Sequence, residues 1–447
     1  MRRIMLAGVS SGSGKTTLTC GILQALANRG FKAASFKCGP DYIDPMFHRK
    51  AIGTPSFNLD SFFCGEDALK YLLHTNAGEA DICVLEGVMG YYDGLGFSDR
   101  HSSYALARLT QTPAVLVMDC KGMGASLSAV LSGFVRHRED SGIAGVIFNR
   151  LPPSLYAGAS AAAQSLGVRP LGYLPALKEW KLESRHLGLV TADELSGLQA
   201  QLAALALKIE ETVDINGLLE LSSGAAELER PDFPHPRCGK PLKIAVASDE
   251  AFCFLYPDNL RFLERCGAQP VFFSPLRDSG LPAGISGLLL CGGYPELYAR
   301  ALSENSALKA QIRDALHKGL PCIAECGGFM YLHEALEDAQ GATYPMAGFL
   351  PGKCFKTARL QRFGYAEMTA RKSGLICEEG NTLRMHEFHY WDSPQNGRDF
   401  LARKEGRPPW ECGILTETFY GGFPHLYFYG NPKAAGHFLE RCEAYGL

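Results

Sequence analysis

The chain has 447 residues, and at about 100–200 residues per domain we expect two or three domains. Apolar residues make up 46% and charged residues 20%, which is typical of a folded soluble protein and excludes a disordered chain. The 44 basic and 47 acidic residues give a net charge of −3, which argues against a nucleic-acid partner or an anionic membrane surface. Fifteen cysteines without a CxxC pair indicate reduced thiols and a cytoplasmic location, and no apolar run is long enough to predict a membrane span.

The first 190 residues alternate short apolar runs with helical stretches. Strands are predicted, in chain order, at 4–7, 33–36, 82–85, 114–118 and 146–148. Their continuous Val, Ile and Leu content favours strands buried on both faces of a parallel sheet. Residues 192–221 are predicted to be helical. A second alternation then predicts strands at 242–247, 271–273, 287–290 and 322–324.

A linker is predicted between these two alternations. Residues 222–240 lose their apolar periodicity and contain Pro231, Pro234 and Pro236. The simplest architecture is two α/β domains, with bounds at 1–225 and 241–447 and a linker at 226–240.

A phosphate-binding loop is predicted directly after the first strand. The segment GVSSGSGKTT, residues 8–17, has small residues whose backbone N–H groups can face an anion, Lys15 to reach terminal phosphates and Thr16 to hold Mg²⁺. Its spacing is G-x5-G-K-T, one residue longer than the usual loop. This variant resembles the dethiobiotin synthetase branch of P-loop enzymes, in which ATP activates a carboxylate as an acyl phosphate.

A charged segment, KCGPDYIDPMFH, follows the second predicted strand. Asp41 and Asp44 lie three residues apart near Lys37, where a loop could meet the γ-phosphate. Either acid could bind Mg²⁺, and Lys37 could neutralise phosphate charge during transfer. The alternative is a surface turn bounded by proline.

Polar residues also follow later strands. Glu86 comes directly after the third predicted strand, and a carboxylate at a carboxyl strand end predicts a metal ligand. Asp93 is either a turn residue or an acid on the substrate side. Asn149 could read an adenine edge or end a strand in a simple turn. The segment ESRHLGL, residues 183–189, could face an anionic substrate or lie at the surface.

A thiol nucleophile is predicted in the second domain at Cys326, in the segment PCIAECGGFM. A strand, a sharp turn and a helix expose such a residue, and the helix N-terminus favours its thiolate. The candidate bases are His386, His389 and His425. The His-Glu-Phe-His spacing does not match the zinc-binding helix motif, so we do not expect zinc. Backbone N–H groups near Gly293 and at Gly327 could form an oxyanion hole.

Taken together, the chain resembles the cobyrinate/hydrogenobyrinate a,c-diamide synthase family of glutamine-hydrolysing corrinoid amidotransferases. The resemblance covers essentially the whole chain and rests on GVSSGSGKTT, KCGPDYIDPMFH, LEGVMGYYDG, ESRHLGL, DEAFCFLYPDNL, CGGYPELYA, AECGGFMYL and HEFHY. It implies an N-terminal ATP-dependent amide ligase and a C-terminal class I-type glutaminase.

The resemblance also implies roles for individual residues. ATP phosphates would be held by the loop residues Gly12, Ser13, Gly14, Lys15, Thr16 and Thr17, with Lys37 and Asn149 as further ATP-binding residues. Thr16 and Glu86 would hold Mg²⁺. Asp41, Asp44 and Asp93 match catalytic acidic positions, and Tyr42 matches a position near the corrinoid. Cys326 matches the glutaminase nucleophile and His425 its histidine, although the segment FPHLYFYGNP around His425 departs from the usual sequence of the family. No third member of the triad is assigned.

The implied reaction amidates two acetate side chains of cobyrinate through acyl phosphates, c before a, with ammonia released from glutamine. The same chemistry on hydrogenobyrinate or nickel-sirohydrochlorin would need nearly the same motifs. A more remote alternative is a partitioning-type ATPase with an inactive glutaminase-like docking domain.

Overall fold

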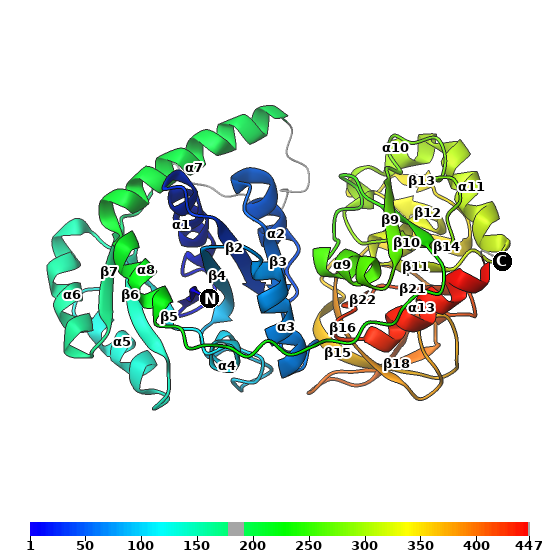
Figure 1. The fold of residues 1–447 in the computed structure, drawn as a ribbon. Helices are drawn as coiled ribbons and strands as arrows, with labels where there is room; N and C mark the ends of the chain where they lie inside the picture. The colour runs from blue at the N-terminus through cyan, green and yellow to red at the C-terminus, as the bar shows by residue number, and fades with distance from the viewer. Residues whose placement is uncertain (178–191, 446–447) are drawn as a thin grey trace. The chain divides into compact units, whose positions relative to one another are not determined.

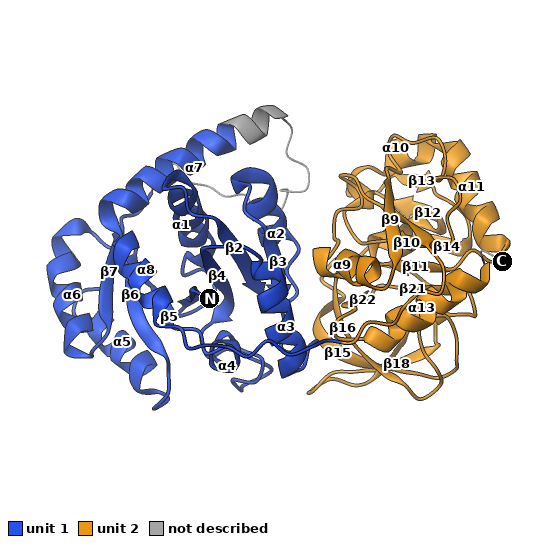
Figure 2. Ribbon diagram, viewed as in Figure 1, with its two compact units in different colours: residues 1–233 blue, residues 234–447 orange. Residues whose placement is uncertain are grey.

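The computed structural model describes residues 1–177 and 192–445, and the chain divides into two compact units, residues 1–233 and 234–447 (Figure 1). Figure 2 shows the division, which falls inside the predicted linker segment. The two ends of that segment are each bound to their own unit. In unit 1, Arg3 Nη2 donates to the carbonyl of Ala226 at 2.5 Å, and in unit 2 the N–H of Cys238 donates to the carbonyl of Cys266 at 2.8 Å.

Unit 1 is built on a seven-stranded sheet in the order β3-β2-β4-β1-β5-β6-β7, and every pair of neighbouring strands is parallel. Helices cover it (Figure 1). The strands are β1 Arg3–Gly8, β2 Ala33–Cys38, β3 Ser56–Leu59, β4 Ile82–Gly90, β5 Ala114–Asp119, β6 Ile143–Asn149 and β7 Arg169–Leu174. The helices are α1 Lys15–Asn28, α2 Ile43–Phe47, η1 His48–Ile52, α3 Glu66–Ala77, α4 Ser103–Leu109, α5 Ser126–Arg136, η2 Pro153–Leu155, α6 Tyr156–Ser165, α7 Ala192–Thr212 and α8 Ile215–Ser223.

The five strands predicted in this unit are confirmed, with two additions and one change of order. The sequence pattern missed β3 and β7, so the strand at Glu86 is the fourth of the chain and not the third. This strand, β4, continues to Gly90, so the prediction that Glu86 follows the strand was wrong and the residue lies inside it. The helical stretch predicted at 192–221 is two helices, because Asp214 caps α8 by accepting from the N–H of Gly217 at 2.8 Å. The continuous apolar strands are buried, as is typical of a sheet covered on both faces.

Unit 2 has a six-stranded sheet in the order β20-β21-β11-β10-β8-β9, in which all neighbours are parallel except β20 and β21. Its strands are β8 Leu242–Ala247, β9 Ala268–Phe273, β10 Gly287–Leu290, β11 Cys322–Glu325, β20 Ile414–Leu415 and β21 Phe419–Gly422. The helices are α9 Pro257–Arg265, η4 Pro295–Leu297, α10 Ala299–Glu304, α11 Ser306–His317, α12 Gly327–Tyr331 and α13 Pro432–Tyr445.

Two further sheets in unit 2 were not predicted. One has the order β13-β12-β14-β17 and the other β19-β18-β15-β16-β22, and the second is antiparallel throughout. Their strands are β12 His333–Glu337, β13 Thr343–Pro345, β14 Leu350–Lys356, β15 Arg362–Ala370, β16 Thr382–His389, β17 Trp391–Asp392, β18 Phe400–Arg403, β19 Trp410–Cys412 and β22 His425–Leu426. The expectation of a plain α/β domain was therefore incomplete. Such strands alternate buried and exposed side chains and lack the continuous apolar runs of parallel strands.

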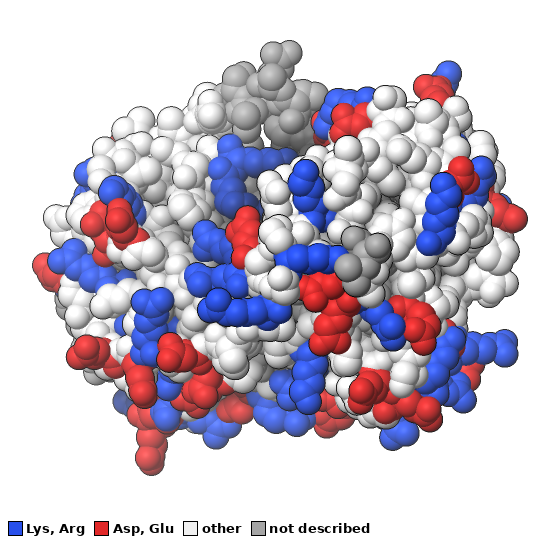
Figure 3. Space-filling view, turned by 45° about the vertical axis from the view of Figure 1, so that its right-hand side comes forward, with Lys and Arg blue, Asp and Glu red and all other residues white. Residues whose placement is uncertain are grey.

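The surface carries both signs of charge. Figure 3 shows Lys and Arg side chains next to Asp and Glu side chains over much of the face drawn. Among the described residues, the helices are all too short or too polar to cross a bilayer.

Candidate functional site

Glycine shapes the loop between β1 and α1. Gly14 has a φ of 89°, and a Cβ at this position would lie 2.1 Å from Nδ2 of Asn149, so a side chain cannot be placed there without movement. Gly12 also has a positive φ, 76°, but with open space around it. Ser13 Oγ donates to the carbonyl of Ser10 at 2.8 Å and accepts from the backbone N–H of Ser10 at 3.0 Å. Local contacts thus fix the predicted phosphate loop.

Lys15 begins α1 and folds back over this loop. Its Nζ donates to the carbonyls of Met89 at 2.5 Å and Ser10 at 3.2 Å. Gly8 leaves space for it, because a Cβ there would lie 2.9 Å from Nζ. Burial, and then the charge of Lys37, lower the pKa of Lys15 to about 8. The ammonium is held at the mouth of the loop, where it can bind a phosphate.

A buried polar cluster lies where the carboxyl end of β2 meets the middle of β4, because Lys37 and Glu86 are register partners there. Thr16 Oγ1 donates to Glu86 Oε1 at 2.7 Å and lies 3.3 Å from Asp44 Oδ2. Lys37 Nζ donates to Asp44 Oδ2 at 2.5 Å and to Glu86 Oε1 at 2.8 Å. The structure thus joins four residues that the sequence placed in three separate motifs.

Glu86 keeps one oxygen without a hydrogen bond from any described residue. The side chain is fully buried, and His48 Nε2 lies 3.7 Å from that oxygen, Oε2. Burial raises the pKa of Glu86 to about 7, whereas Lys37 outweighs burial and lowers the pKa of Asp44. A carboxylate with one orphaned oxygen, whose other oxygen accepts from the Thr16 hydroxyl, fits Mg²⁺, which prefers hard oxygen ligands.

Asp41 and its neighbours begin the short helix α2. Asp41 Oδ1 accepts from the N–H groups of Ile43 at 2.8 Å and Asp44 at 3.1 Å, as a capping residue does. Burial, and then the charge of Asp44, raise the pKa of Asp41 to about 6. Tyr42 is half-buried next to it, and Thr17 is half-buried in the first turn of α1. Of the two acids, Asp44 is the one that joins the buried cluster.

Asp93 lies in the turn that follows β4. Its Oδ2 accepts from the N–H of Gly90 at 2.8 Å, and a Cβ at Gly90 would lie 2.5 Å from the same atom. This contact belongs to a turn, and a role toward substrate stays a prediction. The segment 183–189 lies outside the described residues.

Asn149 ends β6 and contacts the phosphate loop. Its Nδ2 donates to the carbonyl of Ser13 at 2.9 Å, and its Oδ1 accepts from the N–H of Arg150 at 3.0 Å. Arg150, which the sequence reasoning missed, has a φ of 56°, donates from Nε to Asp119 at 2.7 Å and lies 3.4 Å from the carbonyl of Gly12. Both residues therefore brace the loop, and adenine recognition by Asn149 stays a prediction. The signal for Arg150 in the sequence was its place next to Asn149, directly after a predicted strand.

Cys326 lies in a strained turn between β11 and α12, the predicted strand–turn–helix. Its φ is 47° and its ψ −104°, a conformation that costs a non-glycine residue about 1–3 kcal/mol. The N–H of Cys326 donates to the carbonyl of Gly422 at 2.7 Å, which fixes the turn to β21. A Cβ at Gly328 would lie 2.1 Å from the carbonyl oxygen of Leu290, so the second glycine of the motif lets α12 lie directly on β10.

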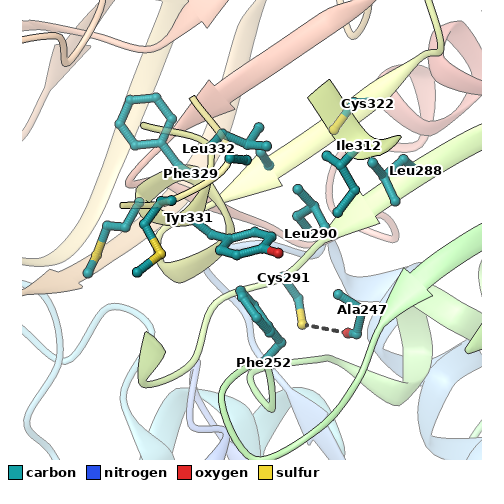
Figure 4. Packing of buried hydrophobic residues seen from close by; sticks show 14 of the residues in the cluster. Ala247, Phe252, Leu288, Leu290, Cys291, Ile312, Cys322, Phe329, Tyr331 and Leu332 are labelled. Atoms are coloured by element: carbon teal, nitrogen blue, oxygen red, sulfur yellow. Dashed lines mark hydrogen bonds between the residues drawn. The ribbon is translucent and has the colours of Figure 1, made fainter. Parts of the chain in front are cut away.

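The turn rests on a packed hydrophobic core. Phe329 and Tyr331 of α12 belong to the same buried cluster as Leu288 and Leu290 of β10, and Tyr331 lies beside Leu290 (Figure 4). Cys291 Sγ donates to the carbonyl of Ala247 at 3.3 Å, which joins β10 to β8. Dense packing of this kind can hold a strained backbone in place.

Of the three candidate histidines, His425 is the one that contacts Cys326, the predicted nucleophile. Its ring is buried, is hydrogen-bonded to the side chain of Cys326, and has Nδ1 at 3.3 Å from Glu325 Oε2. Burial opposes the charged ring, but the bonds to Cys326 and Glu325 outweigh it and raise the pKa of His425 to about 10. Glu325 was not singled out from the sequence, although it adjoins the nucleophile in the same motif.

The two other candidate bases lie on β16. His389 Nδ1 is bonded to the carbonyl of Trp391 at 2.6 Å, and its ring stacks on Phe423. His386 pairs with His425 across the strands, and burial lowers its pKa to about 3. Residues three apart on a strand point to opposite faces, so His386 and His389 cannot converge on one zinc ion locally. No group of three or more His, Cys, Asp or Glu side chains within the described residues is placed to hold a metal.

The two glycines assigned to an oxyanion hole are neighbours. A Cβ at Gly327 would lie 3.0 Å from the backbone nitrogen of Gly293, and one at Gly293 would lie 2.1 Å from the carbonyl oxygen of Ala251. Both positions therefore require glycine, and the two backbones approach each other beside Cys326.

Comparisons with known proteins cover both units. A model described as the CobQ/CobB/MinD/ParA nucleotide binding domain matches residues 4–190, and one described as the CobB/CobQ-like glutamine amidotransferase domain matches residues 243–432. These matches confirm the predicted fold class, a P-loop domain followed by a class I-type glutaminase domain. Among solved structures, PurLQS from Thermotoga maritima aligns with 45% of this chain and 98% of its own at 16% identity and a TM-score of 0.32.

Two curated relatives match along nearly their whole length. The protein named cobyrinate a,c-diamide synthase from Caldanaerobacter subterraneus subsp. tengcongensis is 38% identical over 100% of this chain and 99% of its own. The protein of the same name from Salmonella typhimurium is 39% identical over 98% of each chain. This chain belongs to the cobyrinate a,c-diamide synthase family.

Proposed function

We propose that this chain amidates the a and c acetate side chains of cobyrinate in cobalamin biosynthesis, with ATP as activating substrate and glutamine as nitrogen donor. One observation supports the proposal above all. The same chain carries a phosphate loop and a Cys–His elbow, and relatives named cobyrinate a,c-diamide synthase match it along nearly its whole length. Each unit thus has residues for one half of the reaction.

In unit 2, Cys326 attacks the side-chain carbonyl carbon of glutamine. His425 takes the thiol proton and returns it to the leaving nitrogen, so that the C–N bond breaks and ammonia and a glutamyl thioester form. The backbone N–H groups at Gly293 and Gly327 stabilise the oxyanion. Water then attacks the thioester with help from His425, and glutamate leaves.

In unit 1, an acetate oxygen of the corrinoid attacks the γ-phosphorus of ATP, ADP leaves, and an acyl phosphate forms. Lys15 and Lys37 neutralise phosphate charge during the transfer, and the loop N–H groups orient the phosphates. Thr16 and Glu86 would hold Mg²⁺, which supplies charge neutralisation when bound. Ammonia attacks the acyl carbon, phosphate leaves, and the cycle repeats on the second acetate.

Two substitutions separate the half-reactions. Cys326→Ala should abolish glutamine-dependent synthesis and leave synthesis from added ammonia intact, because only the glutaminase step needs the thiol. Lys15→Ala should abolish both. Product mass and ADP release measure each activity, and full glutamine-dependent activity of Cys326→Ala would refute the assigned nucleophile.

The substrate is tested by supplying cobyrinate, hydrogenobyrinate or nickel-sirohydrochlorin in parallel with ATP and glutamine. Cobyrinate should gain the mass change of two amidations. Conversion of another tetrapyrrole but not of cobyrinate would overturn the substrate assignment. A partitioning-type ATPase would release no ammonia from glutamine at all.

A further inference from the structure

A buried carboxylate stands directly before the nucleophile. Glu325 is the last residue of β11, and its side chain is buried. Its two oxygens both reach the segment that holds the histidine: Oε2 lies 3.3 Å from Nδ1 of His425, and Oε1 accepts from the N–H of Leu426 at 3.1 Å. Two contacts to consecutive residues fix both the carboxylate and the strand β22.

We propose that Glu325 is the third member of the glutaminase triad, a positioning residue that orients His425 and stabilises its charged form. This inference rests on the proposed glutaminase function. The residue two places after the histidine is Tyr427, whose hydroxyl donates to Asp258 at 2.7 Å. The acid therefore comes from the nucleophile's own strand and not from the residues that follow the histidine.

The contact selects one form of the imidazole ring. When Nδ1–H donates to Glu325, the lone pair of Nε2 is available to accept the proton of the Cys326 thiol. The proton then moves from sulfur to Nε2 and on to the leaving nitrogen, while Glu325 stabilises the imidazolium and neither gains nor loses a proton. The raised pKa of His425 agrees with this arrangement.

Other ionisable groups also face His425. His386 lies opposite His425 in the pairing of β16 with β22, and charge interactions link His425 to Glu387 and His389. Glu387 is buried on β16, and its Oε2 has no hydrogen-bond partner among the described residues. It therefore serves as a matched control: a buried glutamate near the same histidine that lacks the contact with Nδ1.

The backbone of β21 fixes the positions of Glu325 and Cys326 together. Glu325 pairs with Gly422 of β21, and Cys326 is bonded to the carbonyl of the same residue. One strand end thus sets the positions of both the thiol and the carboxylate. The histidine, which is 100 residues away in sequence, is brought to a pair whose geometry is already fixed.

The test compares Glu325→Gln, Glu325→Asp and Glu387→Gln in the full-length chain. Glu325→Gln keeps the shape of the side chain but loses its charge, and it should lower kcat for glutamine-dependent synthesis by about 10²–10⁴-fold, the range expected when a triad loses its orienting acid. The KM for glutamine and the ammonia-dependent rate should change little. Glu325→Asp should keep more activity than Glu325→Gln, and Glu387→Gln should stay within about tenfold of the wild type in kcat.

A purely structural role predicts the opposite order, because Gln fills the same space as Glu and Asp does not. Equal or better activity of Glu325→Gln than of Glu325→Asp would overturn the proposal, as would an equal loss in Glu387→Gln. The pH profile of Cys326 alkylation by iodoacetamide gives an independent readout. Loss of the charge should move thiolate formation to higher pH, and an unchanged profile would also overturn the proposal. Failure of the glutaminase function itself would instead appear as full glutamine-dependent activity in Cys326→Ala.

Discussion

The two units both contain a sharp turn between a strand and a helix, but they form it with different residues. Each places a sharp turn at the carboxyl end of a central parallel strand and then begins a helix. In unit 1 the turn is made by glycine, with Gly14 at a φ of 89°, whereas in unit 2 it is made by Cys326 at a φ of 47°. Glycine adopts this backbone at little steric cost, while cysteine is strained there.

The difference follows from which group does the chemistry. A phosphate loop acts through its backbone N–H groups, so the turn can dispense with side chains. In the proposed reaction the side chain of Cys326 is itself the nucleophile, so glycine cannot replace it and the surrounding packing must hold the strained backbone. The units also differ in their buried charges: in unit 1 Lys37 is paired with Asp44 and Glu86, whereas in unit 2 burial keeps His386 neutral.

The largest effect is expected where a glycine of the phosphate loop is replaced. Gly14→Ala places a Cβ 2.1 Å from Asn149 Nδ2 at a positive φ, so the loop must shift. We expect synthesis to fall at least about a hundredfold with glutamine and with ammonia alike, because small misplacements of catalytic groups cost that much. Gly12→Ala has open space and should cost only about 1–2 kcal/mol of backbone strain. Equal activity of the two variants in steady-state assays would contradict this reading of the loop.

The packing beneath the elbow is tested by Gly328→Ala. The new Cβ would lie 2.1 Å from the carbonyl oxygen of Leu290, a backbone atom that cannot rotate away. We expect a loss of about 3 kcal/mol in the free energy of unfolding, measured by urea denaturation. Gly436→Ala in α13 meets its nearest neighbour at 3.7 Å and should stabilise the helix by up to about 1 kcal/mol. A neutral Gly328→Ala would show that the elbow is not held by this contact.

The third prediction concerns acid stability. Burial, and then the charge of His425, lower the pKa of His386 to about 3, below its ordinary value of 6.5. The unfolded chain therefore binds one more proton between these values, and stability falls as the pH drops. This residue should contribute about 2 kcal/mol of the loss between pH 7 and pH 5. His386→Phe, which keeps a ring at this position, should reduce that loss in urea denaturation at the two pH values, and an unchanged pH dependence would contradict the assignment.

The smallest expected effect tests the strain at Cys326 directly. Cys326→Gly should unfold with a free energy about 1 kcal/mol higher than Cys326→Ala, because glycine relieves the backbone strain although it adds freedom to the unfolded chain. Both variants should lack glutamine-dependent activity. Differential scanning calorimetry of the two proteins measures the difference, and greater stability of the alanine variant would show that the turn is not strained.

The sequence predicted the parallel strands well because they are continuous apolar runs that end at glycine or polar motifs. It missed the parallel strands β3 and β21, which have four residues each, and β7, whose apolar residues are interrupted by proline and glycine. It also missed the antiparallel strands such as β16, whose alternation is irregular. None of these strands has a continuous apolar run long enough to distinguish it from a loop. The segment that holds His386 and His389 thus appeared as a loose histidine motif, although it is a strand of the sheet that reaches β22.

By itself the sequence determined the two local motifs, because a phosphate loop and a nucleophile elbow each need particular residues within about ten positions. Only the tertiary structure decided which distant side chains complete them. Lys37 and Glu86 meet because they are register partners on the parallel strands β2 and β4, and α2 brings Asp44 to the same ammonium. Glu325 meets His425 because β11 and the segment around β22 are brought together across 100 residues, a separation that local periodicity cannot encode.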